Sequence, residues 1–194
     1  MQALTLSDIK SLDTYLAERE ERRREMITLR NRRRLAIGEI VSLGFENRQT
    51  LSYQIQEMMR AENMRDERRI VDEIETYNQL VPGKNELSAT LFLEIKDPSL
   101  IKDFLHRFRG IEDSIYLDLG SAGRVQAEPD EKRSTEETTA SVHYLRFRLN
   151  PEQAEAFLNG EGKVRALVEH PQYHESAVID GGTWEELAAD LRGA

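Results

Sequence analysis

The chain has 194 residues, of which 39% are apolar and 32% are charged; this suits one domain with a packed core and is too apolar for a disordered chain. The net charge of −9 argues against a surface that binds nucleic acid or an anionic membrane as a whole. The absence of Cys excludes disulfides, thiolate metal sites and cysteine nucleophiles. The sequence shows neither a secretory signal nor an apolar run of about 18 residues, so we expect a cytoplasmic protein that does not span a membrane.

The first segment, 1–34, predicts an arginine-rich helical region. Its apolar stripe begins at Ile9 and Leu12, stops between 17 and 25, and resumes at Met26. The segment carries nine cationic and six acidic side chains, a net charge of +3 in an acidic chain. Two interpretations of its densest cationic cluster stay open: a docking surface for an anion or an acidic partner, or a helix C-terminus whose arginines pair with acids of the same chain. The cluster consists of Arg30, Arg32, Arg33 and Arg34.

The segment 35–80 predicts a strand or a bent hairpin followed by two helices. Apolar residues alternate along 35–45, which is the period of a strand. Apolar side chains then recur at helical spacing in 49–63 and in 67–80, and Pro82 with Gly83 ends the second helix.

Residues 87–169 predict two tandem strand–helix–strand units. In each unit, Asp or Asn followed by Pro begins the helix and Gly ends it, as expected for helix caps. Two such units favour a ferredoxin-like βαββαβ sheet in the C-terminal two-thirds of the chain. The first unit comprises 87–95, 98–109 and 113–119, and the second comprises 140–149, 151–159 and 163–169.

These elements predict an α+β fold in which the N-terminal helices pack on the open face of a mainly antiparallel sheet. We expect a single domain over 1–194. The polar segment 129–139 predicts a mobile loop between the two units. The chain would end in a short helix at 183–191, with a capping box formed by Thr183 and Glu186.

The densest group of bulky polar residues lies between 45 and 62, where a strand is expected to pass into a helix. Two interpretations stay open: a polar pocket for a ligand, or a hydrogen-bond network that fixes the junction. A metal site built on Glu57, Glu62 and a histidine is a weaker alternative, because the Glu-x-x-His pairs of di-iron bundles are missing. The polar residues of this block are Glu46, Asn47, Arg48, Gln54, Glu57, Arg60 and Glu62.

Two other patterns carry weaker hypotheses. His170 and His174 have the spacing of a helical metal pair, but Pro171 disfavours a helix there. Tyr144 and Arg146 share a face of the strand at 140–149, as in readers of single-stranded RNA. The consensus of those readers is missing, and we expect the N-terminal helices to cover this face.

Catalytic signatures are also missing. The sequence has no Gly-x-Ser-x-Gly, no P-loop and no dinucleotide-binding glycine pattern. We therefore favour a protein without catalytic activity and expect no cofactor.

Several blocks of the sequence together resemble a bacterial domain-of-unknown-function family. The similarity covers about residues 5–180 and includes the arginine-rich opening. The most specific blocks are FENRQTLSYQIQEMMRAE at 45–62, YNQLVPGKNELSATLFLEI at 77–95, VHYLRF at 142–147 and HPQY at 170–173. By position in these blocks, the resemblance adds Tyr77, Asn78, His170 and Tyr173 to the candidate site.

The resemblance implies no catalytic residue, but it does imply which genes neighbour the gene of this protein. Genes of this family often stand beside genes for rubrerythrin and for an iron–sulfur oxidoreductase subunit, so either protein is an expected partner. We predict a non-catalytic accessory or binding protein of a redox or peroxide-defence system, and whether it forms a homo-oligomer stays open. Two alternatives remain: a metal- or small-ligand-binding enzyme that uses the 45–62 block, and a nucleic-acid binder that uses Arg30–Arg34.

Overall fold

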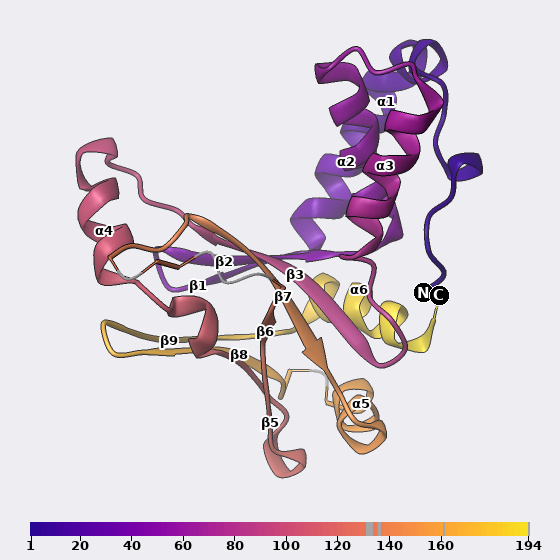
Figure 1. The fold of residues 1–194 in the computed structure, drawn as a ribbon. Coiled ribbons are helices and arrows are strands. Elements are labelled where there is room, and N and C mark those ends of the chain that lie inside the picture. Colours follow the sequence, from indigo (N-terminus) through magenta and orange to yellow (C-terminus); the bar gives the residue numbers. More distant parts are fainter. Residues whose placement is uncertain (131–133, 136, 161, 194) are drawn as a thin grey trace.

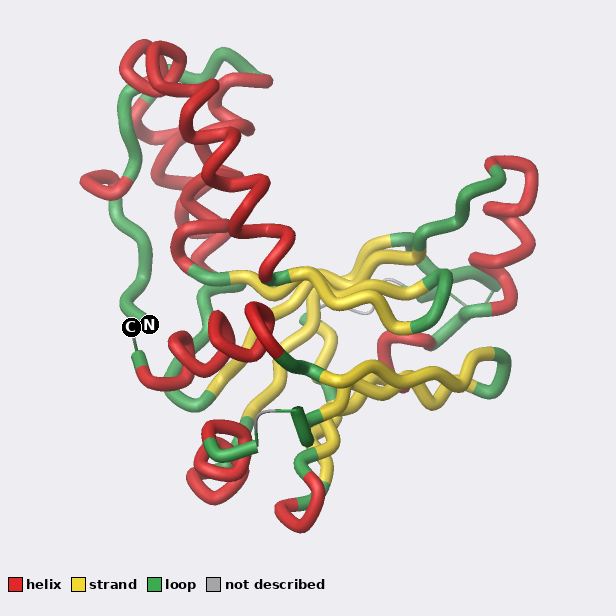
Figure 2. Tube along the Cα trace, turned by 180° about the vertical axis from the view of Figure 1, so that it is seen from behind, coloured by secondary structure: helices red, strands yellow, loops and turns green. Residues whose placement is uncertain are grey.

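The computed structural model describes residues 1–130, 134, 135, 137–160 and 162–193. A helical bundle stands on a β-rich body, and further helices surround the body (Figure 1). The view from behind shows the bundle rising away from one face of the body (Figure 2). Residues 131–133 and 136 of the loop predicted at 129–139 lie outside the described residues.

The bundle is formed by α1 (Leu12–Arg32), α2 (Arg48–Ala61) and α3 (Glu67–Asn78). Its core includes Leu51, Ile55 and Met59, which recur at helical spacing along α2. Residues 1–10, with the short 3-10 turn η1 (Leu6–Asp8), run beside the bundle as an N-terminal arm (Figure 1). Asn78 fastens this arm, because its side chain accepts from the Leu4 N–H at 2.7 Å and donates to the Leu4 carbonyl at 2.9 Å.

The body contains two antiparallel sheets with the strand orders β1-β2-β3-β7-β6 and β5-β4-β8-β9. The first sheet comprises β1 (Arg34–Ile37), β2 (Val41–Glu46), β3 (Glu86–Leu93), β7 (Val142–Arg148) and β6 (Glu128–Pro129). The second comprises β5 (Arg124–Gln126), β4 (Ile115–Asp118), β8 (Arg165–His170) and β9 (Tyr173–Val178).

The main hydrophobic core lies between the two sheets. Alternate residues such as Leu43, Phe147 and Val168 point into it and are almost fully buried. On one side the chain passes directly from β5 to β6, and so from one sheet to the other. On the other side the Tyr173 hydroxyl joins the sheets, because it donates to the Ile37 carbonyl at 2.7 Å. The two sheets are therefore connected along both of their edges, and their inner faces are enclosed.

Helices close the ends of the body and cover its flanks. The turn η2 (Pro98–Leu100) and α4 (Ile101–Arg107) project from one end, and the turns η3 (Ile111–Ser114) and η4 (Gly120–Ala122) flank β4 (Figure 1). The last two helices are α5 (Pro151–Leu158) and α6 (Gly181–Arg192). Leu187 of α6 is fully buried in the main core. None of the helices in the described part of the chain has the length and apolar character needed to cross a bilayer.

The structure confirms the α+β class but not the ferredoxin-like pairing. The predicted strands exist, yet β3 pairs with β7 in one sheet and β4 pairs with β8 in the other. The reason is that β2 occupies the second edge of β3, and the unpredicted β9 occupies the second edge of β8. At the C-terminus, α6 begins after Asp180, so the capping box predicted at Thr183 is wrong.

One buried arginine connects α1, the end of β2 and α6. Arg33 ends α1, is only 1% exposed, and forms an ion pair with the buried Asp190 of α6. Its Nε also donates to the Phe45 carbonyl at 2.9 Å, and its Nη2 to the Glu46 carbonyl at 3.3 Å. Burial raises the pKa of Asp190, and the Arg33 guanidinium offsets part of that rise. The expectation that Arg33 belongs to an exposed docking surface is therefore wrong.

Replacing Arg33 with Met should leave Asp190 buried without its cation. Because loss of one member of a buried ion pair costs about 3–5 kcal/mol, we expect urea unfolding to show a loss of that size. Arg32→Met is the matched control: Arg32 is half-exposed and pairs with Glu185 and Glu186. Its loss should be about 0–1 kcal/mol, as for other surface pairs. Equal losses in the two variants would contradict the role given to Arg33.

Candidate ligand-binding site

The floor of the candidate site is the outer face of the first sheet, which points away from the main core. The strand register places Arg34, Gly44, Thr90 and Tyr144 in one row across β1, β2, β3 and β7. Gly44 has no side chain, so the row is hollow at its centre. A Cβ built at Gly44 would lie 3.3 Å from Cε2 of Phe92, which belongs to the neighbouring row.

The helical bundle forms the walls above this hollow. Because α2 begins two residues after β2 ends, its first two turns stand directly over the outer face. Thr50 and Gln54 of α2, Arg30 of α1 and Tyr77 of α3 line the resulting space together with the floor. We call this space, about 280 Å³ in volume, the sheet–bundle cavity.

Glu46 is the carboxylate of the sheet–bundle cavity. It is half-buried at the end of β2, with one oxygen accepting from Thr50 Oγ1 at 2.5 Å and the other from Thr90 Oγ1 at 2.8 Å. None of the cationic side chains in the described part of the chain lies within ion-pair distance of this carboxylate. Glu46 is thus a negative charge held only by neutral hydroxyl groups.

Arg30 is the corresponding positive charge at the edge of the cavity. Its Nη2 donates to Oε1 of Gln54 at 2.9 Å, and its guanidinium lies 5.4 Å from the centre of the Tyr53 ring. No described carboxylate lies within ion-pair distance of Arg30. Its neighbour Arg34 differs, because Arg34 pairs with Glu94 at 2.7 Å and lies 5.1 Å from the Phe92 ring centre.

Aromatic side chains complete the cavity. Tyr77 reaches it from the last turn of α3 and Tyr144 from β7. Burial raises the pKa of Tyr77, and the nearby charge of Glu73 adds to the rise, so the phenol stays protonated and can donate a hydrogen bond.

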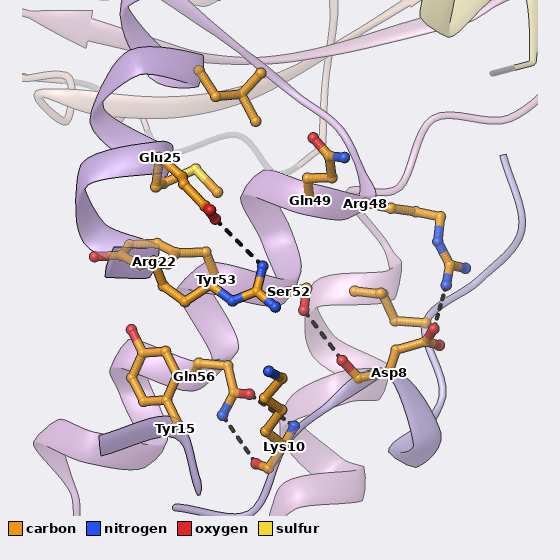
Figure 3. A pocket seen from close by; sticks show the side chains of 13 residues that line it. Asp8, Lys10, Tyr15, Arg22, Glu25, Arg48, Gln49, Ser52, Tyr53 and Gln56 are labelled. Atoms are coloured by element: carbon orange, nitrogen blue, oxygen red, sulfur yellow. Dashed lines mark hydrogen bonds and ion pairs between the residues drawn. The ribbon is translucent and has the colours of Figure 1, made fainter. Parts of the chain in front are cut away.

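A second and larger hollow, about 460 Å³ in volume, lies between α1, α2 and the N-terminal arm (Figure 3). Its charged groups are all paired: Arg48 with Asp8 at 2.7 Å, Arg22 with Glu25 at 3.4 Å, and Lys10 with Glu18 of α1. The Gln56 amide binds the backbone of Lys10 through both of its polar atoms. These contacts fasten the arm to α2 and leave no unpaired charge among the described residues of this hollow.

Two residues of the predicted site hold the backbone in place. Asn47 caps α2, because its side chain accepts from the N–H groups of Gln49 and Thr50, both at 3.0 Å. Asn78 fastens the N-terminal arm, as described above. The hydrogen-bond-network interpretation of the 45–62 block therefore holds for Asn47, whereas Glu46 and Gln54 line the cavity.

Glu57, Arg60 and Glu62 lie on the bundle instead of facing the cavity. Glu57 accepts from Tyr15 Oη at 2.6 Å and from Arg19 Nε at 2.8 Å, and Arg60 pairs with it at 3.3 Å. Glu62 pairs with Arg69 at 2.8 Å. The described residues include no group of three or more His, Asp or Glu that could hold a metal ion. The structure therefore gives no support to a metal site built on Glu57 and Glu62.

His170 and Tyr173 lie at the hairpin that joins β8 and β9, among backbone partners. His170 Nε2 contacts the Arg109 carbonyl at 3.1 Å, and its Nδ1 accepts from the Gln172 N–H at 3.2 Å. Tyr173 joins β9 to β1, where its hydroxyl leaves no room for a Cβ at Gly38, a residue with a φ of +69°. Both residues hold the fold together and do not line the sheet–bundle cavity.

The four arginines of the predicted cluster point to different partners. Arg33 is buried and pairs with Asp190, and Arg32 and Arg34 also pair with acids. Arg30, Arg33 and Arg34 all line the cavity, but Arg30 alone of these three has no ion-pair partner among the described residues. Internal pairing therefore explains most of this cluster, and a nucleic-acid surface made by all four residues is wrong. Gly44, Thr50 and Thr90 were not predicted as site residues, because small side chains do not stand out in a sequence. The strand register brings Gly44 and Thr90 together, and the start of α2 places Thr50 beside them.

The pKa of Glu57 offers a test of the bundle contacts. The bonds from Arg19 and Tyr15 lower it from 4.5 to about 2. Because the folded-state pKa lies below the unfolded one, Glu57 stabilises the protein above about pH 4.5, and that contribution is lost as the pH falls towards 2. We expect Glu57→Gln to be less stable than wild type in urea at neutral pH, with the difference shrinking on acidification. Glu62→Gln, in an exposed pair, is the control, and a pH-independent difference for Glu57→Gln would contradict the assignment.

Comparison with known proteins gives the family but no activity. A family model described as "Protein of unknown function (DUF3501)" matches residues 3–191. A crystal structure of a novel protein of unknown function from Burkholderia pseudomallei K96243 is 33% identical, with a TM-score of 0.91, and covers 98% of this chain and 100% of that chain. A search of the curated proteins found no match. The resemblance seen in the sequence blocks is confirmed: the chain belongs to the DUF3501 family of proteins of unknown function.

Proposed function

We propose that the protein binds a small molecule in the sheet–bundle cavity and acts without catalysing a reaction. The observation that carries this proposal is that Glu46 and Arg30 both line the cavity and neither has an ion-pair partner among the described residues. By contrast, Arg22, Glu25, Arg48 and Asp8 in the larger hollow pair with one another.

The energetics of charge burial support this proposal. A charge that is partly removed from water costs free energy unless an opposite charge or hydrogen bonds compensate. Glu46 is half-buried and is compensated only by neutral hydroxyl groups. Arg30 is exposed at the edge of the cavity and binds the neutral Gln54, so both charges keep part of their hydrogen-bonding capacity for a ligand. The volume of about 280 Å³ lies just below the roughly 300–1,000 Å³ of typical small-molecule pockets, so the cavity suits a small ligand.

The lining favours binding over catalysis. The described residues of the cavity include no His and no Lys, and Glu46 is their one carboxylate. Both oxygens of Glu46 accept hydroxyl hydrogens, so it is placed to hold a donor group.

Blocking the cavity should abolish retention of a small molecule. The purified protein would be incubated with a filtered small-molecule extract of bacterial cells, passed through gel filtration and denatured, and the released compounds identified by mass spectrometry. We expect a compound to be retained by wild type and lost in Gly44→Val, whose side chain would fill the hollow against Phe92. Val142→Phe is a second variant that should block the cavity, so the test remains decisive if Gly44→Val does not fold.

Ser52→Val is the matched control, because Ser52 lines the larger hollow between α1 and α2. It should retain the same compound as wild type. Equal retention by wild type and both blocking variants, or no retention by wild type, would contradict the proposal.

We also propose the accessory role in a redox or peroxide-defence system, with a docking surface different from the one expected from sequence. Arg23 and Arg24 are exposed on α1, and neither pairs with a described carboxylate. An exposed, unpaired arginine pair on a long helix is suited to an acidic partner surface. Rubrerythrin or an iron–sulfur oxidoreductase subunit is the proposed partner, on the basis of the family resemblance.

Charge reversal on α1 tests this docking surface. We expect affinity capture from the native organism under peroxide stress to recover rubrerythrin or the iron–sulfur subunit, and Arg23→Glu with Arg24→Glu to lose it. Lys163→Glu with Arg165→Glu, which reverses two exposed cations near β8, is the control. Arg33 is unsuitable for such a test because its replacement would break the buried pair. Recovery of neither protein, or undiminished capture by the α1 variant, would refute the docking role.

A further inference from the structure

Building on the ligand cavity proposed above, we infer that its ligand is a small zwitterion. Its cationic nitrogen would bind Glu46 and its acid group would bind Arg30. The class includes α-amino acids, short ω-amino acids and betaines. The inference depends on the signs of the two unpaired charges and on the spacing at which α2 holds them.

The Glu46 end of the cavity fits a nitrogen cation. Each carboxylate oxygen accepts one hydroxyl hydrogen, from Thr50 and Thr90, and an ionised carboxylate has further acceptor sites on both oxygens. The rings of Tyr77 and Tyr144 line the same cavity. A carboxylate beside aromatic rings is a favourable environment for an ammonium group, because the faces of the rings carry negative partial charge.

The Arg30 end fits a carboxylate or another compact acid group. An arginine has five N–H donors, and Gln54 engages one of its terminal nitrogens. Gln54 and the Tyr53 ring hold the guanidinium in place without neutralising it. The fixed fork of donors suits a planar carboxylate.

The helix α2 sets the distance between the two ends. Thr50, which holds Glu46, and Gln54, which holds Arg30, are four residues apart and lie on the same face of α2. At about 1.5 Å of rise per residue, the two anchoring residues stand about 6 Å apart along the helix. A molecule whose opposite charges are a few bonds apart matches this spacing.

Ligands with one charge fit less well. An anion on Arg30 would share the cavity with the carboxylate of Glu46, and a cation on Glu46 would share it with the guanidinium of Arg30. In the first case the half-buried Glu46 would lose water without gaining a cation, which disfavours binding. In the second case the exposed Arg30 would stay in water and contribute nothing to binding. A zwitterion compensates both charges at once.

Isothermal titration with defined probes tests this inference on the full chain. The zwitterions are the standard L-α-amino acids, β-alanine, γ-aminobutyrate and glycine betaine. The matched single-charge probes are acids that lack the amino group and amines that lack the carboxylate, such as 4-methylpentanoate and 3-methylbutylamine for L-leucine. We expect at least one zwitterion to bind with a Kd at least about tenfold below those of its two analogues.

Two conservative variants assign the ends of the site. Glu46→Gln should remove the preference for the zwitterion over its acid analogue, and Arg30→Gln should remove the preference over its amine analogue. Arg68→Gln, at an exposed position of α3, should leave both preferences unchanged. Loss of binding without a change in the unfolding temperature separates these effects from misfolding.

The outcomes separate this inference from the proposed function. If no zwitterion binds more tightly than its single-charge analogues, or if none of the probes binds, the zwitterion assignment is overturned. A compound of another charge type retained from the cell extract, and lost in Gly44→Val, would also overturn it while leaving the cavity as the binding site. No retention in that experiment would overturn both.

Discussion

The buried ion pair between Arg33 and Asp190 is the constraint on which the arrangement of the bundle and the body depends. It joins the end of α1 to α6, and the same guanidinium binds the carbonyls of Phe45 and Glu46 at the end of β2. Asp190 also accepts from the Asn47 side chain at 3.4 Å, so the cap of α2 belongs to the same network. These contacts connect segments that are up to 157 residues apart and fix where α2 rises from the sheet. The position of the sheet–bundle cavity follows from that geometry.

The sheet and the bundle contribute complementary parts of the candidate site. The sheet supplies Glu46, Thr90 and the hollow at Gly44, and α2 supplies the two side chains that hold the opposite charges in place. In the bundle, the half-buried Glu57 and Arg19 pair with each other. By contrast, Glu46 and Arg30 line the same cavity, and neither has an ion-pair partner among the described residues. We interpret them as groups kept for a ligand.

The sequence predicted local elements well because periodicity and caps are local properties. The helix at 151–159 matches α5, with Asn150 as its cap, and the hairpin alternative for 35–45 matches β1 and β2. The prediction of one sheet that contains both β3 and β4 failed, because sheet membership depends on long-range packing that single-strand patterns do not encode. Arg33 could not be told from Arg32 in sequence, since its burial depends on Asp190 far along the chain. Of the candidate site, the charged and bulky members Glu46, Gln54 and Tyr77 were predictable, whereas Gly44 and Thr90 required the register of the sheet.

A crystal structure of the protein saturated with the compound that it retains from a cell extract would show whether a small molecule occupies the cavity above Gly44. We expect electron density for the compound over Gly44, with a nitrogen at hydrogen-bond distance from the Glu46 carboxylate and an acidic oxygen at hydrogen-bond distance from Arg30. Density in the hollow between α1 and α2, or on the outer surface, with the cavity empty would contradict it.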